Sequence, residues 1–284
     1  MKKFANFRLL SFLLCCSFAI PDICLAGVDL PWSTTFNCSD WAQGQSLNCD
    51  GLTTGGDWTC NGTKTQITAD ANFANGGGGK GVRFYIGDGT NVGSGNLVVK
   101  FNTPQKEFWV RWYMRYQNGF KWNNITYDKM LYLYTSSTQI IPEWYGWDGI
   151  AIVAQNTGNY YPAKCTGCGW TTVMQGPTSD GKWHCYELHI KMDSNGSNGI
   201  GEFWIDGQKV ISQTNVDWSS GDANARNGVT HFLFNSNQAS PNNGQPTPLD
   251  FDDIVVSDRG YIGPINGSPP SPPAAPTGLR IVGY

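Results

Sequence analysis

The chain has 284 residues and a formal net charge of -3, and only 14% of its residues are charged. This balance gives no sign of a nucleic acid or an anionic membrane surface as the partner. The 35 glycines and the 13% of aromatic residues favour short strands and many turns, and the length suits one all-β domain of roughly 200–250 residues.

Residues 1–26 have the pattern of an export signal. Lys2 and Lys3 precede an apolar stretch over residues 9–20, and Ala26 offers a small residue at the cleavage point. We therefore predict a signal peptide over 1–26 and a secreted protein that is extracellular, periplasmic or at the cell surface. The apolar stretch is too short to remain as an anchor, so no membrane span is predicted.

Of the 9 cysteines, six remain after Cys15, Cys16 and Cys24 leave with the predicted signal peptide. An even number of cysteines in an exported chain predicts disulfides. The predicted half-cystines form two groups of three: Cys38, Cys49 and Cys60, and Cys165, Cys168 and Cys185. If all six are oxidised, at least one bond must join the two groups, but the pairing stays open.

Alternating apolar residues predict strands in the first half of the chain. Val82, Phe84 and Ile86 are expected to face inward, with Arg83 and Tyr85 facing outward. The clearest alternation runs over residues 108–117, where one face carries Phe108, Val110, Trp112, Met114 and Tyr116 and the other carries Trp109, Arg111, Tyr113, Arg115 and Gln117. Residues 129–134 and 150–154 predict two further strands, but both of their sides are apolar or aromatic, so their inward faces stay unassigned.

Residues 184–211 predict an antiparallel meander. Alternation over 184–192 places Glu187, His189 and Lys191 on the polar face, and the next run, 201–205, adds Glu202 and Trp204 to it. The Asp-Gly pair that follows this run is a strong signal for a tight hairpin.

The last two predicted strands cover 230–235 and 250–256. In the first, Asn235 is expected on the outward side, opposite the inward Phe232 and Phe234. In the second, Asp252 shares the side of Ile254 and Val256, so its carboxylate would be drawn toward the interior and would need a cation or hydrogen-bond donors. A structural calcium ion and an aspartate that accepts nearby amide hydrogens stay open as alternatives.

These strands predict a single all-β domain over 27–264, because no long stretch has helical periodicity. Residues 265–284 begin with a proline-rich linker and end in a stub that resembles the first strand of a fibronectin type III module.

Several stretches resemble the concanavalin A-like jelly-roll superfamily, in particular its polysaccharide-lyase-like branch of heparin-lyase-like and alginate-lyase-like enzymes. They are residues 183–188 leading to 201–207, residues 81–85, and residues 252–257 followed by 261–264. The resemblance implies a sandwich of two antiparallel sheets, with a polysaccharide bound along the concave one. The same fold serves lyases, glycosidases and lectins, so it does not determine the activity.

A lyase of this kind needs a cation or amide for the uronate carboxylate, a base and an acid. The predicted catalytic residues are Tyr113 as base or acid, His189 as second choice for that role, and Arg111 with Asn235 as carboxylate neutralisers. Arg83, Tyr85, Arg115, Lys191, Glu202 and Trp204 are predicted to bind the substrate, and Asp252 to bind calcium. A secreted protein that binds an acidic polysaccharide, with or without cleavage by β-elimination, is the leading hypothesis.

Three alternatives remain beside it. The closely spaced Glu-x-Asp-x-x-Glu run of jelly-roll glucanases is absent from the sequence, which argues against retaining hydrolysis. A non-catalytic carbohydrate-binding module and a cell-surface adhesion or structural protein both stay open. The sequence assigns neither the sugar nor the oligomeric state.

Overall fold

The computed structural model describes residues 28–36, 65–73, 79–86, 97–118, 127–145, 149–154, 159–162, 180–235 and 247–265. The predicted signal peptide, linker and stub lie outside the described residues, as do Cys38, Cys49, Cys60, Cys165 and Cys168 and the side chain of Tyr85. The described part of the chain has no helix that is long and apolar enough to cross a membrane.

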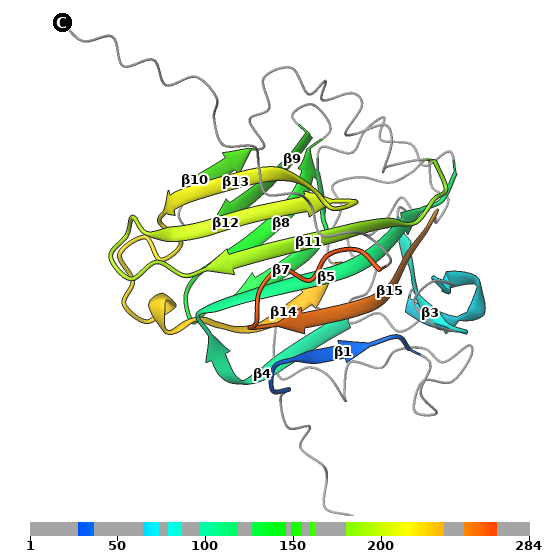
Figure 1. The fold of residues 1–284 in the computed structure, drawn as a ribbon, viewed down its shortest axis with the longest axis horizontal. Coiled ribbons are helices and arrows are strands. Elements are labelled where there is room, and N and C mark those ends of the chain that lie inside the picture. Colours follow the sequence, from blue (N-terminus) through cyan, green and yellow to red (C-terminus); the bar gives the residue numbers. More distant parts are fainter. Residues whose placement is uncertain are drawn as a thin grey trace, which may run out of the picture.

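The described strands form two stacked antiparallel sheets (Figure 1). The first sheet has the order β13 (Gln208–Val216), β12 (Gly199–Ile205), β11 (His184–Lys191), β5 (Glu107–Tyr116), β15 (Thr247–Ser257), β3 (Gly81–Ile86) and β2 (Thr65–Thr68), with β1 (Trp32–Thr34) paired to β15. The second sheet has the order β10 (Asn159–Pro162), β9 (Gly149–Ala154), β8 (Gln139–Tyr145), β7 (Leu131–Tyr134), β14 (Val229–Phe234) and β4 (Leu97–Gln105), with β6 (Tyr127–Lys129) paired to β8. The predicted all-β jelly-roll sandwich is therefore confirmed.

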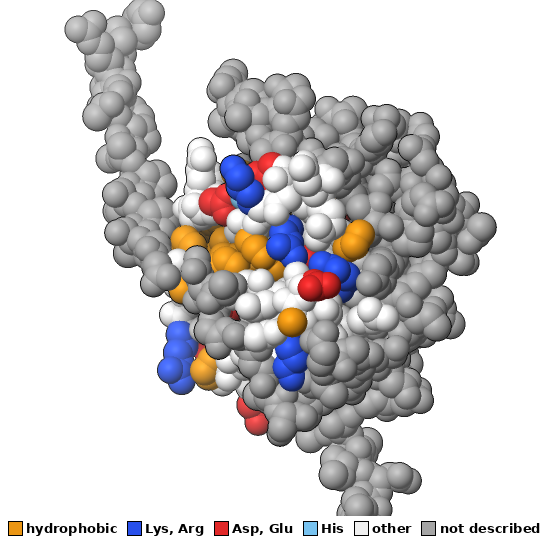
Figure 2. All heavy atoms as spheres, turned by 90° about the vertical axis from the view of Figure 1, so that its right-hand side faces the viewer, with side chains coloured by type: hydrophobic (Ala, Val, Ile, Leu, Met, Phe, Trp, Pro, Cys, Tyr) orange, Lys and Arg blue, Asp and Glu red, His pale blue; other side chains and the backbone are white. Residues whose placement is uncertain are grey.

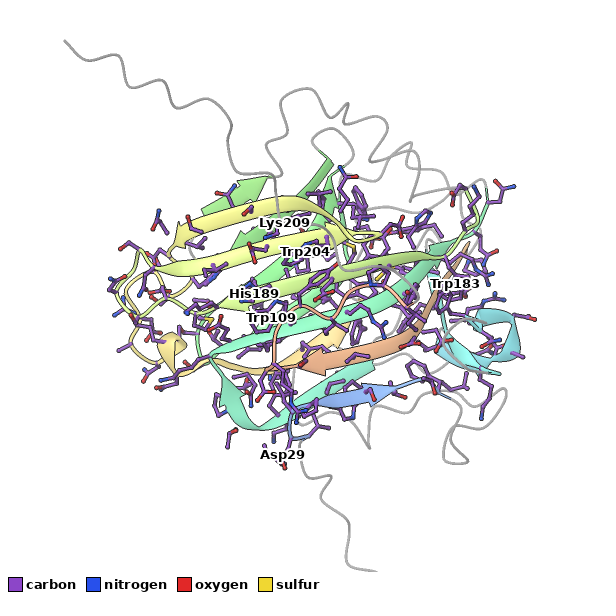
Figure 3. The ribbon with its side chains drawn as sticks, viewed as in Figure 1. Asp29, Trp109, Trp183, His189, Trp204 and Lys209 are labelled. Atoms are coloured by element: carbon purple, nitrogen blue, oxygen red, sulfur yellow. The ribbon has the colours of Figure 1, made fainter. Side chains whose placement is uncertain are left out.

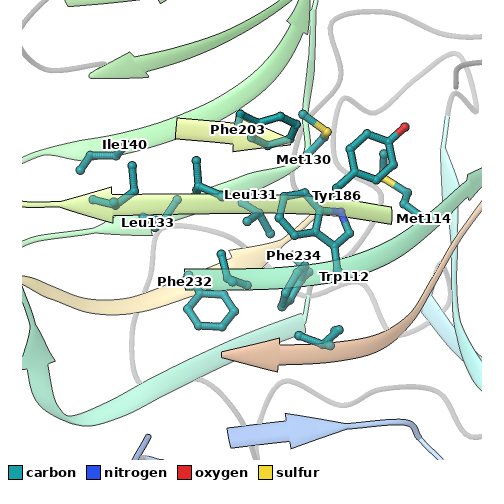
Figure 4. Packing of buried hydrophobic residues seen from close by; sticks show 14 of the residues in the cluster. Trp112, Met114, Met130, Leu131, Leu133, Ile140, Tyr186, Phe203, Phe232 and Phe234 are labelled. Atoms are coloured by element: carbon teal, nitrogen blue, oxygen red, sulfur yellow. The ribbon is translucent and has the colours of Figure 1, made fainter. Parts of the chain in front are cut away.

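The core lies between the two sheets and follows the predicted alternation. Phe108, Val110, Trp112 and Met114 are fully buried, and Tyr116 is 1% exposed. The Trp112 ring packs against Phe203 from the same sheet and Phe234 from the opposite sheet, with ring centroids 5.8 and 6.1 Å apart (Figure 4). Burial of such large apolar surfaces is the main favourable term in holding the sheets together.

The structure assigns the faces of β7, which the sequence left open. Leu131 and Leu133 point into the core between the sheets. Tyr132 belongs to a separate apolar cluster on the other side of the second sheet, and Tyr134 packs against that cluster. The second sheet therefore carries aromatic side chains on its outer face.

The predicted turn and the last strand have different outcomes. Asp206 and Gly207 form the tight hairpin between β12 and β13, with φ angles of 50° and 80°. In β15, however, the pairing with β5 shifts register between Asp252 and Val255, and Asp253 has φ 48°. This bulge reverses the alternation. Asp252 lies directly opposite the outward Tyr113, so the prediction that it shares a side with Ile254 and Val256 is wrong.

Candidate functional site

Most of the predicted site residues gather on the outer face of the first sheet. Arg111 lies directly opposite Glu187, and His189 lies directly opposite Glu202. Directly opposite residues of antiparallel strands share one face of a sheet. Figure 3 shows part of this arrangement, with Trp109, His189, Trp204 and Lys209 in a row across neighbouring strands. The sequence therefore predicted the shared face of these side chains correctly.

The arginines on this face are paired with aspartates of β15. The fully buried carboxylate of Asp250 accepts from Nε of Arg83 at 2.7 Å and from a terminal nitrogen of Arg115 at 2.6 Å. Arg111 donates to the Asp253 carboxylate at 2.5 Å. Figure 2, which views the molecule from the right-hand side of Figure 1, shows basic and acidic side chains next to one another. The arginines that were predicted to bind the substrate are thus already paired with aspartates of the protein itself.

Tyr113 is covered by Phe73 and by the segment that follows β15. Its ring stacks on Phe73 with centroids 3.7 Å apart, and its hydroxyl accepts the backbone N–H of Ile265 at 2.7 Å. Burial, with a smaller contribution from Cys185, raises the pKa of Tyr113 well above its ordinary value. Tyr113 is 4% exposed, and its hydroxyl is already hydrogen-bonded to the backbone of Ile265. It is therefore poorly placed to exchange protons with a bound polymer.

Glu187 holds the same covering segment, residues 261–265. Its two carboxylate oxygens accept the backbone N–H groups of Ile262 and Gly263, both at 2.8 Å. Burial raises the pKa of Glu187 to about 7, although these two hydrogen bonds act in the opposite direction. Tyr261 packs on the Trp204 ring at 5.1 Å. The covering segment therefore closes the middle of the predicted groove.

His189 lies between two carboxylates that also contact lysines. Its ring stacks on Trp109 at 4.0 Å, Nδ1 lies 2.9 Å from Glu202, and Nε2 lies 3.2 Å from Glu107. Lys191 lies 3.1 Å from Glu107, and Lys209 donates to Glu202 at 2.6 Å. Hydrogen bonds from His189 and Lys209 outweigh burial and lower the pKa of Glu202.

Asn235 is not part of this face. It follows β14 in the second sheet, is fully buried and donates its backbone N–H to Met130 at 2.9 Å. The sequence could not show this, because the choice of sheet for a strand depends on pairing with residues far along the chain. The expected pairing of Asn235 with Arg111 around one carboxylate is therefore not formed.

The carboxylate of Asp252 accepts two backbone hydrogens, from Phe73 and from Asp253, each at 2.7 Å. Burial raises its pKa to about 7. The neighbouring Asp250 and Asp253 carboxylates face arginines, and no cluster of three or more His, Cys, Asp or Glu ligands is found in the described ranges. Each aspartate has protein partners without a cation, so calcium at Asp252 stays a prediction that this geometry does not favour.

Cys185 is a free, buried thiol, so its predicted disulfide is not formed. The alternation of β11 places Cys185 in a small cluster with Phe73 and Tyr113. Burial raises the pKa of the thiol to about 12, which keeps it protonated and unreactive.

A second group of polar side chains lies on the outer face of the second sheet. Tyr134 stacks on His231, directly opposite on β14, with ring centroids 4.5 Å apart and planes 5° from parallel. Tyr132 lies 6.0 Å from Tyr134, and the Lys129 ammonium lies 5.2 Å from the centroid of the Tyr132 ring. We call these four residues the Tyr–His strip. Within the strip, Tyr132 is fully buried, and the other three residues are partly exposed.

The environment of the strip changes its proton affinities. Burial lowers the pKa of His231, and the nearby charge of Lys100, which lies opposite on β4, lowers it further. Burial also lowers the pKa of Lys129, which the Glu143 carboxylate partly offsets. His231 is therefore neutral at neutral pH, beside a lysine and a phenol.

A protein-family model described as polysaccharide lyase matches residues 35–234. The chain belongs to the polysaccharide lyase family. Among curated protein sequences, none matches it.

Solved structures similar to this family member share its fold at low identity. A mutant alginate lyase in complex with alginate trisaccharide has a TM-score of 0.52 and 14% identity, over 81% of this chain and 99% of that chain. The alginate lyase of Aplysia kurodai has a TM-score of 0.52 and 9% identity, over 79% and 97% of the two chains. The cellulose-induced protein has a TM-score of 0.51 and 13% identity, over 82% and 99%.

The Tyr–His strip was not predicted from the sequence. Its two tyrosines stand at period two on β7, which was a usable signal for a shared face. Leucines occupy the other positions of β7, however, and both sides looked equally fit for the core. The position of His231 beside Tyr134 depends on strand pairing, which local alternation does not reveal.

Proposed function

We propose that this protein binds an acidic polysaccharide along the outer face of the second sheet and cleaves it by β-elimination. The observation that carries the proposal is which ring nitrogens of the histidines have hydrogen-bond partners. The chain has three, all within the described residues. His184 and His189 have a carboxylate at each ring nitrogen. His231 contacts Thr230 through Nδ1, and no side chain or backbone group of the described residues forms a hydrogen bond with its Nε2.

The reaction needs three groups in one place. A base removes the proton next to the uronate carboxylate, a cation stabilises the negative charge that develops there, and an acid protonates the leaving oxygen. The electron pair of the broken C–H bond forms the carbon–carbon double bond as the bond to the leaving oxygen breaks. The products are an unsaturated uronate and a new chain end.

The strip and Lys100 supply these groups. His231, neutral because its pKa is lowered, is the base. Lys100 lies opposite it on β4 and faces the carboxylate, and Tyr134, stacked on the imidazole, is the acid. Lys129, whose ammonium lies over the buried Tyr132 ring, extends the strip onto β6, where a neighbouring sugar unit would lie.

The contacts on the first sheet argue against a substrate site there. Its arginines are held by Asp250 and Asp253, and the Tyr113 hydroxyl is held by Ile265. A substrate carboxylate there would have to displace aspartates that are already in contact, with the cost of leaving them unpaired. Export, predicted from residues 1–26, fits a polymeric substrate found outside the cell.

The test uses the same substitution on the two opposite faces. Purified protein is assayed on alginate, glucuronan, heparin and neutral glucans, both for retention and for the ultraviolet absorbance of the new double bond. Lys100→Ala should weaken retention of an acidic polymer, whereas Lys191→Ala on the first sheet should not. His231→Gln should abolish the absorbance, with His189→Gln as the matched control.

The outcomes separate the alternatives. Retention of acidic polymers without absorbance would identify a binding module and overturn cleavage. If Lys191→Ala weakened retention of an acidic polymer and Lys100→Ala did not, the binding site would lie on the first sheet. Binding of neutral glucans alone would contradict the acidic substrate, and no retention of any polymer would favour an adhesion or structural role.

A further inference from the structure

The Thr230 hydroxyl lies between two groups on the outer face of the second sheet. Its Oγ1 lies 3.2 Å from the backbone carbonyl oxygen of Tyr134 and 2.9 Å from Nδ1 of His231. Both contacts are partly buried, so water competes with them less than at an exposed site.

The number of hydrogens decides the direction of both bonds. A hydroxyl has one hydrogen to donate, and a carbonyl oxygen can only accept. The Thr230 hydrogen must therefore point to the Tyr134 carbonyl for that contact to be a bond. Oγ1 then faces Nδ1 of His231 with a lone pair, and Nδ1 must carry the hydrogen. A neutral imidazole with hydrogen on Nδ1 has its lone pair on Nε2.

We propose that Thr230 is a positioning residue that fixes His231 in the Nδ1–H tautomer and so makes Nε2 the atom that accepts the substrate proton. The catalytic part of this inference rests on the proposed function, whereas the tautomer does not depend on any activity. In metal sites, the partner that fixes the tautomer and orientation of a ligating histidine changes affinity or activity by about 10- to 100-fold, and we expect an effect of this size for Thr230.

Local structure explains why consecutive residues act together here. The pairing of β14 with β4 shifts register between Val229 and His231, and such irregularities re-aim side chains. The Tyr134 ring, parallel to the imidazole within 5°, fixes the ring plane. Among the described residues, the titratable side chains that lie directly opposite His231 on the adjoining strands are Tyr134 from β7 and Lys100 from β4.

The test is the ring tautomer of His231, measured by nitrogen-15 NMR on the full, unliganded protein above the pKa of His231. We expect hydrogen on Nδ1 in the wild type and in Thr230→Ser, which keeps the hydroxyl. Thr230→Val has nearly the same shape without a hydroxyl, and it should shift the population toward hydrogen on Nε2. Circular dichroism establishes that the variants are folded. If Thr230→Val does not fold, Thr230→Ala replaces it.

The kinetic arm uses whichever acidic polymer the wild type cleaves. Thr230→Val should lower kcat by about 10- to 100-fold with little change in KM. It should also lower the apparent pKa of the base in the pH profile, because the protonated ring loses an acceptor. Thr230→Ser should restore both.

Hydrogen on Nε2 in the wild type, or an unchanged tautomer in Thr230→Val, would overturn the inference. If the wild type cleaves no polymer, the proposed function fails, and the NMR result alone decides the role of Thr230.

Discussion

The carboxylate of Glu187 accepts the backbone N–H of Gly263 at 2.8 Å, and this bond connects the middle of the first sheet to the segment that follows β15. This carboxylate is only 1% exposed, and burial raises its pKa to about 7. In the unfolded chain the same group titrates near 4.5. The folded protein therefore binds more protons than the unfolded chain between these two values, so the stability from Glu187 is present at low pH and is lost as the pH rises through 7.

We expect Glu187→Gln to change how the free energy of unfolding depends on pH. Glutamine loses one of the two amide acceptors but cannot ionise. Between pH 5 and pH 8, the wild type should lose stability relative to the variant by on the order of 3 kcal/mol. Urea unfolding at both pH values measures the difference, and Glu107→Gln controls for the loss of a carboxylate on the same face. Parallel stability curves for wild type and Glu187→Gln would contradict the prediction.

Asp250→Asn should destabilise the fold by about 3 kcal/mol, because it removes the buried carboxylate that two adjacent arginines share and leaves Arg83 only the exposed Asp70. Asp250 is fully buried between Arg83 and Arg115, whose side chains are 13% and 21% exposed. The midpoint of urea unfolding measures the loss. Asp258→Asn, at an exposed position, should change stability by less than about 0.5 kcal/mol. Equal effects of the two substitutions would show that the Asp250 cluster contributes little.

The thiol of Cys185 should resist labelling in the folded protein and react once the protein is unfolded. Its burial and its pKa of about 12 keep the thiolate population negligible. Alkylation before and after denaturation without reductant, followed by peptide mass spectrometry, locates the label. Recovery of Cys185 in a disulfide-linked peptide would contradict the structure and restore the six-cysteine prediction.

Calcium at Asp252 predicts a metal-dependent melting temperature. If the ion is bound there, added calcium should raise the Tm, chelator should lower it, and Asp252→Asn should remove the difference. The two amide hydrogens that the carboxylate accepts provide an alternative in which none of these changes occurs. A Tm that is the same with calcium and with chelator would therefore reject the calcium prediction.

The sequence predicted what depends on period two and on turn chemistry. The faces of β5 and β11 and the turn at Asp206 follow from alternation and from φ angles above zero. A one-residue bulge at Asp253 was enough to reverse the side of Asp252, because alternation carries no mark of an inserted residue.

Long-range pairing limited the prediction of the site. The sequence showed that arginines line one face, but not that Asp250 stands between two of them. It also gave no indication that Asn235 follows a strand of the second sheet, or that His231 lies against Tyr134. Each of these contacts joins residues from separate strands. A candidate site consists of such contacts, which local sequence patterns do not reveal.

β15 is the last of the strands in the described part of the chain, yet it lies inside the first sheet between β5 and β3 and also pairs with β1. While the ribosome has delivered the chain only as far as β14, β5 and β3 each present an unpaired edge, and such edges are templates for association between chains. The sandwich cannot close until residue 257 has emerged. We therefore expect a gene truncated ahead of Thr247 to yield aggregated protein, because both sheet edges that β15 covers would stay open.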